Sequence, residues 1–150
     1  MTLIDPAYPQ EDAARRPFFT PQQADRALVL IRRIVSDVTG LYAHLLDLQE
    51  TVEAADGVGN APGAAARDDL VRTAERLHDC LEELDELGIE LTDWDRGVVD
   101  FPCIAGGREV RLCWGQGERS ICHWHEVHEC GGVRYSLETL PACEPAEALR

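Results

Sequence analysis

The chain has no lysine. Its 14 basic side chains are all arginines and stand against 28 aspartates and glutamates, so the formal net charge is −14 over 150 residues. So acidic a chain disfavours non-specific binding to nucleic acid, whose phosphates need cationic partners, and to an anionic membrane face. Beyond that, acidity bears on solubility rather than on mechanism. We attribute the absence of lysine to genome composition.

Long apolar runs are also missing. No stretch of about 18 apolar residues is present, which excludes a transmembrane helix. The first residues, MTLIDPAYPQEDAARRPFF, lack the basic segment and apolar core of a secretory signal, so we expect a cytoplasmic protein. In that compartment the six cysteines should be free thiols. None of them is spaced C-x-x-C, which excludes a thioredoxin-like motif and a common zinc knuckle.

Nucleotide-binding fingerprints are absent as well. The sequence contains neither a Walker loop nor a Rossmann G-x-G-x-x-G motif, and the glycine-rich segment GVGNAPG (57–63) follows a predicted helix instead of a strand. We therefore expect no nucleotide cofactor.

A long amphipathic helix is predicted from Pro21 to about Ala55. Thr20 and Gln23 have the spacing of a capping box, and Pro21 occupies the first helical position, where proline costs nothing. Apolar residues then recur at alternating spacings of four and three, the heptad rhythm of a coiled-coil seam. A second helix carries the same rhythm from Leu70 to Leu84 and ends before Gly88, with Ile89 folding back on Leu84. Joined by one loop, the two helices should pack as an antiparallel hairpin.

After Gly97 the hydrophobic period changes to two. Three strands are predicted in VVDFPCI, REVRLCW and SICHWHEV, separated by the turn segments AGG (105–107) and GQGE (115–118). The fold class is therefore α+β: a long antiparallel helical hairpin followed by a small three-stranded antiparallel sheet. We divide the chain into a flexible tail (1–17), a single domain (18–136) and a loose C-terminal tail (137–150).

Four segments, FFTPQQADRALVLIRRIV, LGIELTDWDRGVVDFP, GREVRLCWGQGE and CHWHE, resemble in order and spacing the bacterial domain-of-unknown-function family 2203. The resemblance covers roughly Phe18 to Arg134 and implies a small cytosolic bacterial protein with its signature in the C-terminal half. It implies no activity. The matching positions are Gly97, Asp100, Phe101, Cys113, Trp114, Glu118, Trp124, His125 and Glu126. His123, His128, Cys122 and Cys130 are outside the signature.

The segment SICHWHEVHEC (120–130) carries the residues most suited to chemistry. A tight turn at 106–107 would place Asp100 opposite Cys113, on the sheet face that points away from the helices. If Trp124 joins the core, His123 and His125 share that outer face. Two imidazoles, a carboxylate and a thiol then form a candidate site for zinc or iron. The metal ligands predicted are His123, His125, Asp100 and Cys113.

Three other interpretations stay open. In the first, Cys113 with His125 and Asp100 would form a thiolate pair, although a structural thiol is the favoured reading. In the second, the protein is a metal-dependent enzyme with an open coordination position and Glu126 or Glu118 as the proton-transfer group. In the third, the chain is a helical interaction module, the histidines are a solvated polar face, and the whole cluster is incidental. His128 could add a ligand from the loop after the strand, and whether His128, Cys122 and Cys130 take part stays open.

The function we expect is that of a small binding or scaffold protein that self-associates as a homodimer and carries a metal site on the sheet. The apolar arc of the helices is wider than a two-helix hairpin needs. In so thin a fold the extra apolar surface is usually buried either by the sheet or by a second copy of the chain, and burial by a second copy is the basis for expecting self-association. Neither nucleic acid nor membrane is an expected partner.

Overall fold

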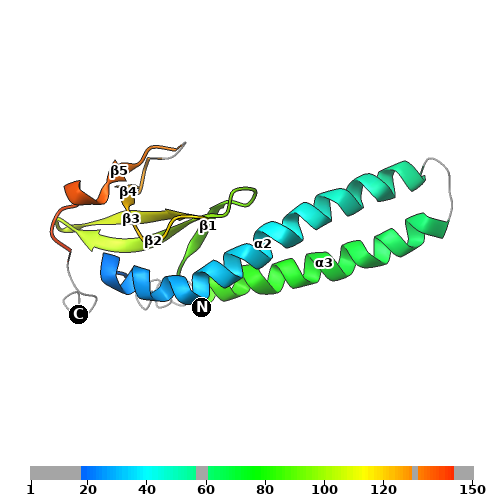
Figure 1. Ribbon diagram of the computed structural model, residues 1–150, viewed down its shortest axis with the longest axis horizontal. Helices are drawn as coiled ribbons and strands as arrows, with labels where there is room; N and C mark the ends of the chain where they lie inside the picture. The colour runs from blue at the N-terminus through cyan, green and yellow to red at the C-terminus, as the bar shows by residue number, and fades with distance from the viewer. Residues whose placement is uncertain (1–17, 57–60, 130–131, 144–150) are drawn as a thin grey trace, which may run out of the picture.

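The computed structural model describes residues 18–56, 61–129 and 132–143. They form α2 (Pro21–Asp56), α3 (Ala61–Glu86), β1 (Glu90–Asp93), β2 (Val98–Ala105), β3 (Arg108–Gly115), β4 (His123–Glu126), β5 (Tyr135–Ser136) and the 3-10 helix η1 (Leu137–Thr139). The predicted α+β class is confirmed. The two helices pack side by side, and the first turns of α2 lie against the sheet while the rest extends away from it (Figure 1). Neither α2 nor α3 has an apolar stretch long enough to cross a bilayer.

The start of α2 is capped as the sequence predicts. The Thr20 backbone N–H donates to Gln23 Oε1 at 2.9 Å, and the Gln23 N–H donates to Thr20 Oγ1 at 3.2 Å. These reciprocal bonds satisfy two backbone donors that a helix start leaves without partners. The first turn of α2 is therefore held in place where it meets the sheet.

The end of α3 is a Schellman motif. Gly88 has φ 78°, its N–H donates to the Asp85 carbonyl at 2.9 Å, and the Ile89 N–H donates to the Leu84 carbonyl at 3.0 Å. Leu84 and Ile89 are both buried in one hydrophobic cluster, and the hydrogen bond between their backbones shows that the chain folds back at this turn as predicted. This motif reverses the chain and leads directly into β1.

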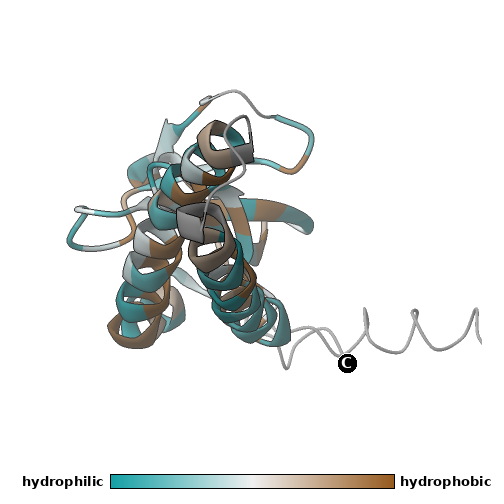
Figure 2. Ribbon diagram, turned by 90° about the vertical axis from the view of Figure 1, so that its right-hand side faces the viewer, coloured by the Kyte–Doolittle hydropathy of each residue, from teal (hydrophilic) through white to brown (hydrophobic). Residues whose placement is uncertain are grey.

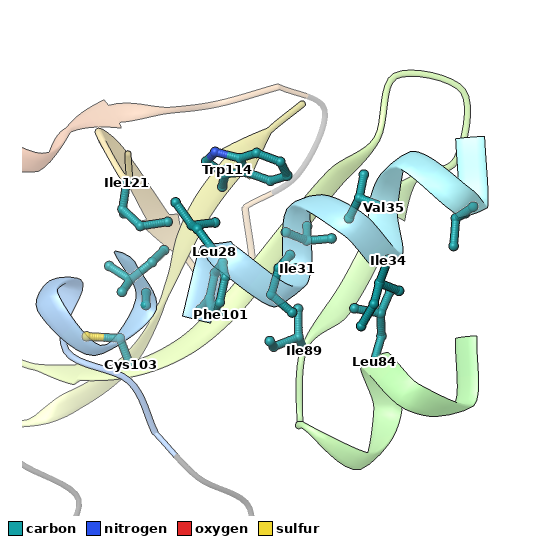
Figure 3. Packing of buried hydrophobic residues seen from close by; sticks show 14 of the residues in the cluster. Leu28, Ile31, Ile34, Val35, Leu84, Ile89, Phe101, Cys103, Trp114 and Ile121 are labelled. Carbon is teal, nitrogen blue, oxygen red and sulfur yellow. The ribbon is translucent and has the colours of Figure 1, made fainter. Parts of the chain in front are cut away.

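One hydrophobic core joins the helices to the sheet. Leu28 and Ile31 of α2 lie over the sheet near Phe101 and Trp114, whereas Ile34 turns toward Leu84 of α3 (Figure 3). Viewed from their far end, both helices carry hydrophobic residues on some sides and hydrophilic residues on others (Figure 2). The first half of α2 therefore packs against the sheet, and its second half packs against α3.

The sheet has five strands in the order β1-β2-β3-β4-β5, each antiparallel to its neighbour. The prediction of three strands was wrong because the two outer strands are short. β1 has four residues and an irregular register, and β5 has two. Strands so short show too few alternations to be recognised by period, and their pairing with β2 and β4 is what defines them.

The register of β2 and β3 is the predicted one. Asp100 pairs with Cys113 and Phe101 with Leu112, and the turn between the strands consists of Gly106 and Gly107 at φ 61° and 77°. Positive φ at both central residues is typical of the two-residue hairpin turn whose twist matches that of the strands, and glycine adopts it without strain.

Gly97 lies where α2 approaches the turn before β2. Its φ is 74°, and a Cβ atom there would come within 2.7 Å of Val35 Cγ1 and 3.0 Å of Thr39 Cγ2. Gly107 has nearly the same φ, 77°, but its Cβ would meet nothing within 4 Å. A side chain at Gly107 would therefore cause backbone strain alone, whereas a side chain at Gly97 would cause strain and steric overlap together.

We predict that Gly107→Ala lowers the free energy of unfolding by about 1–2 kcal/mol through strain alone. Gly97→Ala should cost about 3 kcal/mol, because overlap with the α2 side chains adds to the strain. Denaturant unfolding of both variants beside the wild type measures the difference. Equal losses would show that α2 moves aside without cost.

Candidate metal-binding site

The two faces of the sheet differ in chemistry. Val99, Phe101, Val110, Leu112, Trp114 and Trp124 are buried in the core on the helix side. Strand alternation therefore turns Asp100 and Cys113 to the opposite face. The β3–β4 register pairs Arg111 with His125 and Cys113 with His123, which brings both histidines to the same outer face. The predicted sorting of side chains between the two faces is confirmed.

Asp100, Cys113 and His125 form a buried cluster on that face. A carboxylate oxygen, the thiol sulfur and a ring nitrogen all lie within 4.8 Å of one another. Their residues are 5%, 5% and 9% exposed. Within residues 18–56, 61–129 and 132–143 this is the group of three or more such side chains whose spacing could hold a metal ion. Its members come from three adjacent strands: β2, β3 and β4.

His125 is held at both ring nitrogens. Nδ1 lies 2.8 Å from the Glu126 carbonyl oxygen, and because a carbonyl only accepts, Nδ1 carries a hydrogen. Nε2 lies 2.9 Å from Asp100 Oδ2 and points into the cluster. Metal-binding histidines commonly donate one N–H to a carbonyl in this way, which fixes the ring and directs the other nitrogen at the ion.

Asp100 has an oxygen without a partner. Oδ2 contacts His125, but Oδ1 is buried and makes no hydrogen bond. Burial raises the pKa of Asp100 above its ordinary value, and His125 offsets part of this rise. A buried acceptor without a partner is costly, and a cation or a proton at this position would remove the cost.

Cys113 is a poor nucleophile in this setting. Burial, followed by the charge of Asp100, raises the pKa of the thiol to about 11. Reactive cysteines instead have a lowered pKa and a histidine that takes their proton. Here the ring nitrogens of His125 are engaged by Asp100 and by the Glu126 carbonyl. The geometry therefore does not support the thiolate-pair interpretation.

His123 lies beside the cluster and not within it. It pairs with Cys113 across the strands, but its ring nitrogens are outside the group of mutually close ligand atoms. Nδ1 is buried without a hydrogen bond and lies 3.8 Å from Glu118 Oε2. The structure thus brings together three of the four predicted ligands, whereas the fourth, His123, lies next to Glu118.

Glu118 and Arg134 form a polar bridge next to the cluster. Arg134 Nη2 donates to both carboxylate oxygens of Glu118 at 2.9 Å, and the Gly115 N–H donates to Glu118 Oε1 at 2.8 Å. Arg134 also lies close enough to Cys113 to lower the pKa of its thiol slightly against the effect of burial. We did not predict a role for Arg134, because an isolated arginine in the segment GGVRY has no periodic or motif signal.

The remaining candidates lie elsewhere. Glu126 is bound by Arg108, whose Nε donates to it at 2.9 Å, and it pairs with Val110 on the helix side of the sheet. His128 is exposed, and so is Cys122, which contacts the Ser120 hydroxyl at 3.6 Å. Cys130 is outside the described residues. Glu118 is therefore the predicted proton-transfer candidate that lies nearer the cluster.

The fold and cluster together define an α+β protein with a buried candidate metal site on the sheet face that points away from the helices. The family of uncharacterized conserved proteins DUF2203 matches residues 17–136, and the chain belongs to this family. No curated protein and no solved structure matches the chain.

The Glu118–Arg134 pair should make stability depend on pH. Burial alone would raise the pKa of Glu118, but the hydrogen bonds from Arg134 and Gly115 lower it below its ordinary 4.5. A lowered folded-state pKa means that the stabilisation is complete above the unfolded-state pKa and is lost as pH falls through the folded-state value.

We therefore predict that Glu118→Gln loses less free energy of unfolding than the wild type between neutral pH and about pH 3. Urea unfolding across that range measures both slopes. Glu53→Gln, an exposed change on α2, is the control and should keep the wild-type slope. Parallel curves for the wild type and Glu118→Gln would contradict the prediction.

Proposed function

We propose that this protein binds a divalent transition metal through Asp100, Cys113 and His125 and acts as a small metal-binding protein. The observation that carries the proposal is the arrangement of these three donors. They are buried within 4.8 Å of one another, with one ring nitrogen of His125 directed inward and one oxygen of Asp100 without a partner.

The donor set indicates which metal. One sulfur, one nitrogen and one oxygen suit zinc or iron(II), whereas magnesium and calcium prefer oxygen alone. As ligands, Asp100 and Cys113 would both be ionised, and their two negative charges would match a divalent ion. A bound cation would also reverse the effect of burial on both groups, since it favours the charged forms that burial disfavours.

The number of ligands distinguishes a structural site from a catalytic one. Four protein ligands close a zinc site, whereas three leave a position for water. His123 is the candidate fourth ligand, because its Nδ1 is buried without a partner on the same face. If His123 stays with Glu118, the open position favours the alternative, a metal-dependent enzyme in which Glu118 moves the proton.

The test is elemental analysis of untagged protein purified without chelator. We expect near-stoichiometric zinc or iron in the wild type and loss of the metal in His125→Ala, Asp100→Asn and Cys113→Ser. His44→Ala, an exposed histidine on α2, is the matched control and should retain full loading. Wild type that stays free of metal after incubation with zinc or iron(II), while folded, would refute the proposal.

Cobalt(II) substitution then reports the coordination number. A closed site that includes His123 predicts an intense four-coordinate spectrum that weakens in His123→Ala. An open site predicts the same spectrum for His123→Ala and the wild type, together with a change when a small anion is added.

A second proposal concerns the helices. We infer that α2 and α3 form an antiparallel hairpin through which two copies of the chain associate. Four apolar side chains on the helices support it, since Val29, Leu30, Leu46 and Val71 are 74%, 44%, 43% and 59% exposed. Packing against a second hairpin would remove such side chains from water, as in a four-helix arrangement.

We predict that the wild type sediments as a dimer and that the double change Leu46→Glu with Val71→Glu shifts it to monomer, because charge at the interface opposes association. Val127→Glu is the control, since Val127 is 46% exposed and lies just after β4 instead of on a helix. Analytical ultracentrifugation measures all three. A monomeric wild type at high concentration would overturn the inference.

A further inference from the structure

Two cysteine thiols lie close together on the helix side of the sheet, opposite the face that carries Asp100, Cys113 and His125. Cys103 belongs to β2, is fully buried and turns to the helix side, where it borders the hydrophobic core (Figure 3). Cys143 lies 40 residues later and is half-buried. Their sulfur atoms are 3.7 Å apart, which is close to van der Waals contact.

The backbone holds these two residues near each other. Cys143 forms an antiparallel bridge with Ala105, and the Gly106 N–H donates to the Ala142 carbonyl at 3.0 Å. Pro141 packs so tightly on Gly106 that a Cβ atom at Gly106 would come within 2.9 Å of it. The contact between the thiols therefore follows from a docked segment and not from a chance approach of two side chains.

We propose that Cys103 and Cys143 are an oxidisable dithiol, which small-molecule disulfides of the glutathione type convert to an intramolecular disulfide. The bond would fasten the C-terminal segment to β2. The proposal is independent of metal binding, because neither residue belongs to the cluster on the opposite face.

The reaction proceeds by two thiol–disulfide exchanges. The Cys143 thiolate attacks one sulfur of the small disulfide, whose S–S bond breaks and releases one thiolate. The Cys103 sulfur then attacks the Cys143 sulfur of this mixed disulfide, and the second thiolate leaves. The two cysteines lose two electrons and two protons in total, and the small disulfide takes them up as two thiols.

The order of attack follows from exposure. A reagent reaches half-buried Cys143 before fully buried Cys103. Burial, followed by the nearby Cys143, raises the pKa of the Cys103 thiol, so Cys103 is the weaker first attacker, and it reacts in the second step because the Cys143 sulfur is already beside it. From 3.7 Å the sulfurs must approach by roughly 1.6 Å to reach disulfide length.

The consequence is a stabilised sheet. The disulfide would close a loop of 40 residues that contains β3 and β4, the strands that bear Cys113 and His125. Cross-linking so long a loop restricts the unfolded chain, and a rise in Tm on the order of 10 °C is expected.

The experiment is peptide mapping after treatment of the full chain with oxidised glutathione. Free thiols are blocked with an alkylating reagent, and the protein is digested with trypsin without reduction. Cleavage after arginine gives peptide 97–108 with Cys103 as its one cysteine and peptide 135–150 with Cys143 as its one cysteine. A species two hydrogens lighter than the sum of these peptides identifies the bond without ambiguity.

We expect this linked species in the wild type, in Cys122→Ser and in Cys113→Ser, with a Tm that rises on oxidation and returns on reduction. Cys143→Ser should lose both the linked species and the rise in Tm, and because Cys143 is half-buried this change should leave the fold intact. A stable glutathione adduct on Cys143 without the linked species would overturn the proposal. So would linkage of either peptide mainly to peptide 120–134, which holds Cys122 and Cys130.

Discussion

The pairing of β2 with β3 in one register is the constraint on which the rest of the structure depends. Phe101, Leu112 and Trp114 are nearly free of solvent contact under α2, and burying them fixes which face of each strand is turned inward. A slip by one residue would exchange the two faces and place Asp100 and Cys113 in the hydrophobic core. The turn at Gly106 and Gly107 makes the correct register the favourable one, because only residues that tolerate positive φ close so tight a hairpin.

The polar face follows from the same constraint. With the helix side filled by apolar side chains, the carboxylate, thiol and imidazole are left together on the other side. There Asp100 and Cys113 are nevertheless almost fully buried, in surroundings to which Arg134 and Glu118 contribute. Burial raises the pKa of both the acid and the thiol. A group of donors that is costly to ionise without a cation is well suited to bind one, so the burial that the fold imposes on these residues favours the proposed function.

The two cysteine environments show how position decides chemistry. Cys113 lies among groups that can share a metal ion, whereas Cys103 lies beside another thiol at the border of the core. The proposed redox chemistry of one face and the proposed metal chemistry of the other therefore use the same residue type without competing. β2 carries one member of each group, Asp100 on one face and Cys103 on the other.

The sequence by itself determined the elements whose signals are local. The capping box at Thr20, the end of α3 at Gly88 and the glycine turn at 106–107 each depend on a few neighbouring residues, so their residue types predicted them. It also determined that Asp100 and Cys113 share a face, because alternation and one turn suffice for that, whereas the face of His125 depended on the burial of Trp124, which the structure confirms. Only the tertiary structure decided the short strands β1 and β5, the separation of His123 from the cluster, the bridge from Arg134 to Glu118 and the contact of Cys143 with Cys103. Each of these joins residues that are distant along the chain or lacks a period, and such contacts exist only once the helices and the sheet have packed.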